Sequence, residues 1–240
     1  VVFEYPPAAG LMLGLMGLAS GPNPMVFQMV FMGSMFLLML LVFILAFNEA
    51  ETLIANGGPD RRVHIFIASL AAMLSAGPVA LVSFDLFPAV LTLGAVLYTF
   101  RNRTVRAAGL LALAVAFKGY ALVLTPLFAI AAYRQGGIRK VISGIAAFTG
   151  VLAAFALAAV LISPSGFLAS FTYHGGRGLE LNSLYAALLI IMKHFGYMTL
   201  GNTFTHGSWT LTGGTAVRLL ESLSTPLLAC ALTAGLWRGW

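Results

Sequence analysis

From Ser83 to Tyr133 the sequence reads, in succession, SFDLFPAVLTLGAVLYTF, RNRTVR, AAGLLALAVAF, K and GYALVLTPLFAIAAY, and this segment determines how the helices are arranged. It places one acid, Asp85, at the start of an apolar segment and one cation, Lys118, in the middle of another. An ionisable side chain inside membrane hydrocarbon is costly and by default marks a functional position. Asp85 and Lys118 are therefore the first candidates for a site.

Two basic clusters flank the apolar residues 107–133. They consist of Arg101, Arg103 and Arg106 before the segment, and Arg134, Arg139 and Lys140 after it. Loops rich in lysine and arginine favour the cytoplasmic side of a membrane. If both clusters are cytoplasmic, the segment between them must enter the membrane and return to the side from which it came.

The length of this segment favours a short helical hairpin over a full crossing. As a helix, residues 107–117 rise roughly 17 Å at about 1.5 Å per residue. That is near half of a hydrocarbon core of about 30 Å, so Lys118 is expected at the apex, deep in the membrane. We expect Gly119 to supply the bend and Pro126 to kink the return arm. Asp85 begins its helix from the far side, so both charges should face one extracytoplasmic pocket.

The composition is that of a polytopic membrane protein. Of the 240 residues, 60% are hydrophobic and 8% are charged, whereas soluble domains carry about 25% charged residues. Nine of the thirteen basic residues fall in loops predicted to be cytoplasmic, so we do not interpret the net charge of +6 as a sign of nucleic-acid binding. A single cysteine excludes an internal disulfide and a cysteine-based metal site. We expect one transmembrane domain over residues 1–240.

The order of apolar and polar segments predicts an all-α polytopic membrane protein with short re-entrant or half helices and extracytoplasmic loops. Crossing helices are expected at 25–48, 63–77, 85–100, 141–163 and 215–236, with the helical hairpin between the third and fourth. We expect residues 8–19 to dip into the outer leaflet and residues 183–200 to form an interfacial helix. Polar extracytoplasmic loops are predicted at 164–182 and 201–214.

Each membrane charge has a functional and a structural interpretation. Lys118 suits a buried phosphate, but a lysine in such a place also snorkels to an interface or pairs with one acid. Asp85 suits a sugar hydroxyl or a cation, and equally a helix N-cap at the membrane surface. The sequence alone leaves these alternatives open.

A glycine-rich loop combines a base, a cation and an acid within seven residues: His174, Arg177 and Glu180. Its glycines let the backbone approach a ligand, and arginine suits bidentate phosphate binding. The alternative is an ordinary polar turn. The four histidines are scattered, with no i, i+4 pair, so we expect no metal. There is also no phosphate-binding loop of the nucleotide-binding type.

Five segments, taken in order, resemble glycosyltransferase family 87, the polyprenol-phosphate-mannose-dependent mannosyltransferases and their relatives. They are Glu4-Tyr5-Pro6-Pro7, Phe84-Asp85-Leu86-Phe87-Pro88-Ala89, Lys118-Gly119-Tyr120, the loop Tyr173–Glu180 with Ser183 after it, and Gly207-Ser208-Trp209. The sequence departs from the family pattern at three of these positions. Ala121 replaces a proline, Tyr173 a phenylalanine and Asn182 a glutamate.

The resemblance implies a fold of the GT-C type and hexosyl transfer, with mannose the expected sugar, from a polyprenyl-phosphate donor to a lipid or glycan acceptor. It places the protein in a prokaryotic cytoplasmic membrane with an extracytoplasmic active site. We expect no cofactor. In the family, a catalytic aspartate precedes the EYPP element. We therefore expect the first helix and the loop with this base to precede Val1, which would leave Glu4 as the nearest carboxylate and this fragment inactive.

The resemblance also implies roles for particular residues. Lys118 and Arg177 would bind the donor phosphate, and the sugar or the acceptor would contact Asp85, Tyr120, His174 and Glu180. Two other classes of function stay open: a transporter or flippase of lipid-linked sugars, whose polar residues would also lie at mid-membrane, and a non-catalytic protein that binds such lipids.

Overall fold

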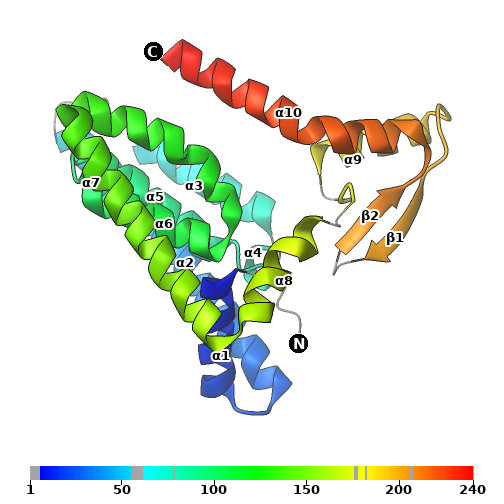
Figure 1. The fold of residues 1–240 in the computed structure, drawn as a ribbon, viewed down its shortest axis with the longest axis horizontal. Helices are drawn as coiled ribbons and strands as arrows, with labels where there is room; N and C mark the ends of the chain where they lie inside the picture. Colours follow the sequence, from blue (N-terminus) through cyan, green and yellow to red (C-terminus); the bar gives the residue numbers. More distant parts are fainter. Residues whose placement is uncertain are drawn as a thin grey trace. The chain divides into compact units, whose positions relative to one another are not determined.

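The computed structural model describes residues 6–55, 62–77, 79–175, 178–181, 183–205 and 208–239, and most of them are helical. The described residues divide into two compact units, an N-terminal unit up to Ile162 and a C-terminal unit that begins at Ser163. Glu4 and Arg177 lie outside the described residues. Figure 1 gives the path of the chain through each unit.

The N-terminal unit is entirely helical in its described part. Its elements are α1 (Pro7–Ser20), α2 (Pro24–Ala55), α3 (Arg62–Ala76), α4 (Val79–Val82), α5 (Leu86–Phe100), α6 (Thr104–Phe117), the 3-10 helix η1 (Gly119–Leu124) and α7 (Thr125–Ile162). Among these, α6 packs most closely on α5 and α7. Two described helical stretches are long and apolar enough to cross a membrane, Pro24–Glu49 and Gly119–Ile162.

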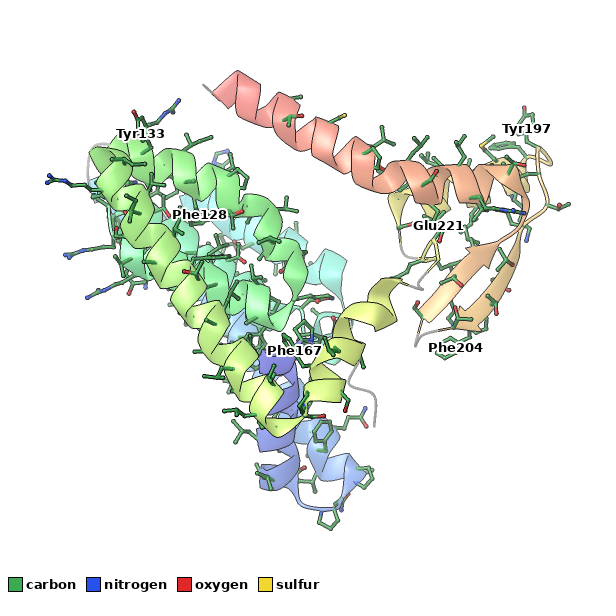
Figure 2. The ribbon with its side chains drawn as sticks, viewed as in Figure 1. Phe128, Tyr133, Phe167, Tyr197, Phe204 and Glu221 are labelled. Carbon is green, nitrogen blue, oxygen red and sulfur yellow. The ribbon has the colours of Figure 1, made fainter. Side chains whose placement is uncertain are left out.

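The hairpin geometry expected around Lys118 is present. The Nε2 of Gln135 donates a hydrogen bond of 2.8 Å to the carbonyl oxygen of Thr99, and the Oγ1 of Thr104 donates one of 3.4 Å to the Oε1 of Gln135. The two basic clusters therefore meet at one end of the unit, which we call the basic end, and Lys118 lies at the other. Figure 2 shows Tyr133 at the basic end, on α7 one residue before Arg134. The side of the membrane that this end faces stays a prediction.

The turn at the apex differs in detail from the expectation. Helix α6 ends at Phe117, Lys118 is extended with φ −157° and ψ 118°, and Gly119 begins the 3-10 turn with no positive φ. Pro126 does not kink the return arm, because it lies in the first turn of α7, where proline is tolerated.

The break in α7 lies instead at Gly136 and Gly137, whose backbones are not helical. Gly137 has φ +65°, in the left-handed region that favours glycine. Gly144, beyond the break, lies against Thr104 and Ala108 of α6. The chain therefore reverses direction at the two glycines, and residues 138–162, which span roughly 37 Å as a helix, run back past α6.

Small residues form the core of this unit. The buried residues of α6 are almost all alanine: Ala107, Ala108, Leu111, Ala112, Ala114 and Ala116. A Cβ atom on Gly94 of α5 would come within 3.0 Å of Leu110 on α6. Small side chains that let backbones approach closely are typical of helix contacts in membranes, where burial of apolar surface from water does not drive association.

The C-terminal unit contains α8 (Pro164–Gly175), α9 (Leu184–His194), strands β1 (Gly201–Thr205) and β2 (Ser208–Thr212), and α10 (Gly214–Gly239). The mostly helical character agrees with the predicted all-α class, but the residues expected to form a polar loop at 201–214 include β1 and β2, which pair antiparallel. The hairpin and the helices enclose a small core of Leu179, Ala186, Leu189, Leu211 and Val217. Phe204 and Trp209 pair across the strands, both more than half exposed, and Phe204 points away from α10 (Figure 2).

Candidate site at the hairpin apex

The two membrane charges singled out in the sequence are in contact. The Nζ of Lys118 donates a hydrogen bond to the Oδ1 of Asp85 and forms an ion pair with it. Asp85 stands at the start of α5 and Lys118 just past the end of α6, and these antiparallel helices bring their ends together. The side chains are 49% and 39% exposed, respectively, so a ligand outside the unit can reach both.

Ser83 and Phe84, the two residues that precede Asp85, contact the ion pair and hold it in place. The hydroxyl of Ser83 donates a hydrogen bond of 2.7 Å to Oδ2, the other carboxylate oxygen of Asp85. The ring of Phe84 is buried, and the Nζ of Lys118 lies 5.5 Å from its centroid. A cation at this distance from an aromatic face is attracted by the ring quadrupole. The ammonium is therefore held between a carboxylate and an aromatic face.

An aromatic stack joins the two helix ends beneath the charges. The rings of Phe87 on α5 and Phe117 on α6 lie 5.6 Å apart and nearly parallel, at 8°. Tyr120 follows on η1 and is about half exposed. The geometry of the apex thus rests on packing as well as on charge, and an exposed phenol lies two residues from the lysine.

These contacts bear on the alternatives that the sequence left open. Asp85 occupies an N-cap position, but its side chain makes no capping hydrogen bond. Its carboxylate accepts from Ser83 and Lys118 instead, so the capping interpretation is wrong for the side chain. Lys118 does pair with one acid, as its structural interpretation proposed. That pairing is half exposed, and an ammonium has three donors, so it does not exclude a bound anion.

The candidates from the glycine-rich loop belong to the C-terminal unit. Glu180 forms a β-bridge with Thr210, flanked by a hydrogen bond of 2.8 Å from Leu211 N to Leu179 O. Glu180 is therefore held at the edge of the β-hairpin and is partly exposed. His174 lies in α8, but its side chain is outside the described part. The expected meeting of Lys118 and Arg177 at one phosphate stays a prediction.

The structure adds residues that sequence reasoning missed. Ser83 and Phe84 contact the ion pair, and Phe87 stacks on Phe117. A carboxylate oxygen of Glu221 lies 3.6 Å from where a Cβ on Gly178 would stand. The serine two residues before an acid was the available signal, because such short side chains often bond to local groups. Nothing in the sequence pattern points to Glu221 beside Gly178.

Comparisons with known proteins do not decide among the functions left open. No family model matches the chain, and neither a curated protein nor a solved structure gives a match. Within the described residues, no three side chains among His, Cys, Asp and Glu are grouped closely enough to hold a metal ion. The contacts at the apex are therefore the structural basis for a functional proposal.

Proposed function

We propose that the protein is a membrane glycosyltransferase that moves a hexose, with mannose the expected sugar, from a polyprenyl-phosphate donor to a lipid or glycan acceptor on the extracytoplasmic side of a prokaryotic cytoplasmic membrane. The observation that carries this proposal is the half-exposed Lys118 at the apex of a short helical hairpin, paired with Asp85. The resemblance of five short segments to glycosyltransferase family 87 supports the same assignment.

The position of the lysine suits a phosphate carried on a lipid. A polyprenyl chain keeps its phosphate near the membrane, so the cation that binds it must lie at a comparable depth. A lone lysine at that depth is expensive, and Asp85 and the Phe84 ring offset part of this cost. A donor phosphate would then join or replace the carboxylate as the partner of the ammonium, and Asp85 would become available to a sugar hydroxyl.

The reaction that we propose exchanges one bond for another at the anomeric carbon of the sugar. The bond from this carbon to the phosphate oxygen breaks, and the bond to the acceptor oxygen forms. A carboxylate takes the proton of the acceptor hydroxyl, and polyprenyl phosphate leaves with the bonding electrons. Lys118 would stabilise the charge that develops on the leaving phosphate. We assign the proton acceptor to none of the described residues.

A transfer assay separates this function from its alternatives. Membranes with the full-length gene product would receive polyprenyl-phosphate mannose labelled in the sugar, with a lipid extract as acceptor. We expect labelled product with the wild type and a loss of about tenfold or more with Lys118→Met, since a charge-assisted contact is worth roughly 1.5–3 kcal/mol. Lys193→Met is the matched control, because that lysine bonds to the carbonyl of Leu200 in the C-terminal unit. Donor binding or translocation without transfer would favour a binder or a flippase.

A further inference from the structure

An apolar cavity of about 300 Å³ lies inside the helical hairpin, distinct from the apex site. Most of its lining comes from α6 and from the parts of α7 before and after the Gly136–Gly137 break, with Thr99 of α5 and Leu122 of η1 added. Most of the lining is apolar, including Ala107, Ala108, Leu111, Ala129, Ala132 and Phe148. The cavity is partly open to the outside, and its volume falls at the lower limit of known small-molecule sites, about 300–1,000 Å³.

Three of the four polar residues that line this cavity lie at the basic end, and the fourth, Thr125, lies near the apex, where its hydroxyl donates a hydrogen bond to the carbonyl oxygen of Leu122. Thr99, Thr104 and Gln135 all contribute to the lining, and the hydrogen bonds of Gln135 tie them together. Away from this end, aliphatic and aromatic side chains dominate the lining. A ligand that fits must therefore be apolar along most of its length and polar at one end.

The cations of the basic end stand beside the lining residues. Arg103 precedes Thr104, Arg134 precedes Gln135 and Lys140 precedes Val141, and each second member of these pairs lines the cavity. The side chain of Lys140 lies over Gly136, so its stem covers the break in α7. Arg101 is paired with Glu49 at 2.7 Å, and the guanidinium of Arg106 lies over the Tyr98 ring. At the basic end, Arg103 and Lys140 are therefore each the neighbour in sequence of a residue that lines the cavity.

We propose that this cavity binds one acyl chain of an anionic phospholipid, with the headgroup phosphate held by Arg103 and Lys140. Charge complementarity selects this occupant: a zwitterionic lipid offers the same chain but no net negative charge. Basic pockets between membrane helices on the cytoplasmic side are known to hold anionic headgroups. The proposed headgroup cations lie at the end of the hairpin opposite Lys118, although the cavity itself extends to Leu122 and Thr125 near the apex. Neither Lys118 nor Asp85 lines the cavity, so this proposal does not depend on glycosyl transfer.

Quenching by brominated lipids tests the proposal. Trp209, Trp237 and Trp240 are first changed to phenylalanine. The reporter is then Phe148→Trp, which places a single tryptophan on the cavity wall. The purified protein would be placed in phosphatidylcholine vesicles that contain, at equal mole fraction, phosphatidylglycerol or phosphatidylcholine brominated in the acyl chains. The matched control is Leu157→Trp, an exposed position on the same helix that does not line the cavity.

We expect brominated phosphatidylglycerol to quench the Phe148→Trp reporter more than brominated phosphatidylcholine does, and the two lipids to quench the Leu157→Trp control equally. Arg103→Gln with Lys140→Gln should lower the preference of the cavity reporter by about 25-fold, because each such cation contributes about fivefold. Ala132→Leu, which fills the cavity, should reduce quenching of this reporter by both lipids. Equal quenching of the cavity reporter by the two lipids, or no quenching, would overturn the proposal.

A second measurement needs no change to the aromatic residues and guards against a misfolded reporter. The unaltered chain would be released from mixed phosphatidylglycerol and phosphatidylcholine micelles into a mass spectrometer under conditions that preserve bound lipid. We expect retained phosphatidylglycerol with the wild type and an approximately 25-fold lower preference for it with the double glutamine variant. Retention of the two lipids in proportion to their supply would contradict the proposal.

Discussion

Lys118 and Asp85 form an ion pair although 33 residues separate them in the chain. The contact closes the end of the N-terminal unit opposite its basic clusters, where the start of α5 meets the end of α6. Because the two charges compensate one another at the expected membrane depth, the removal of one should be more harmful than the removal of both.

This difference gives a prediction for stability. A charge that loses its partner is destabilising, whereas a pair replaced as a whole is often nearly neutral. We expect Lys118→Met to lower the midpoint of thermal unfolding in lipid nanodiscs, and Lys118→Met combined with Asp85→Asn to recover at least half of that loss. If the double variant is as unstable as the sum of the single variants, Lys118 and Asp85 are not coupled in the membrane.

The shared end of the two basic clusters gives a prediction for topology. In a Cys230→Ser background, cysteines at Asn102 and Ile138 should both resist a membrane-impermeant thiol reagent added from outside. Ile138 is chosen because it is well exposed, whereas the side chain of Gln135 is hydrogen-bonded. Asn202→Cys, on the exposed strand β1, should react from outside and serves as the positive control. Reaction of just one of the two loop cysteines would rule out the hairpin.

The reversal of α7 gives a prediction about glycine. Gly137 has φ +65°, a conformation that costs other residues roughly 1–2 kcal/mol. Gly137→Ala should therefore lower the unfolding midpoint. Gly150→Ala lies within a regular helix with open space around the new methyl group, so it should leave stability unchanged or raise it by about 0.5–1 kcal/mol. Equal effects of the two substitutions would mean that the left-handed turn is not required.

The helical hairpin could be predicted because it depends on charge and length. Basic clusters on both sides of residues 107–133 favour the same side of the membrane, so the chain between them must enter and return. The helix from the first cluster to Lys118 is too short for a full crossing. The details of the turn could not be predicted in this way. Pro126 and the pair Gly136–Gly137 are all helix breakers in sequence, and only the contacts of α6 with both parts of α7 decide which of them ends a helix.

The β-hairpin and the surroundings of the ion pair were missed for different reasons. Phe204, Trp209 and Leu211 alternate with threonine or serine, a period-two pattern that indicates strands. This pattern alone does not predict a hairpin, because the residues between the strands lack a typical two-residue turn sequence. The contact of Phe84 with Lys118 could not be predicted, because it depends on the register of α5 against α6, and apolar helices of a membrane carry little periodicity to fix a register.

The central claim is that Lys118 binds the phosphate of a lipid-linked donor. The most direct test compares the affinity of the purified protein for polyprenyl phosphate with its affinity for the polyprenol of equal length, which differs by the phosphate alone. We expect the wild type and Lys118→Arg to prefer the phosphate by about tenfold or more. Lys118→Met should abolish this preference while binding of the alcohol is unchanged. An undiminished preference in Lys118→Met would contradict the proposed role of the lysine.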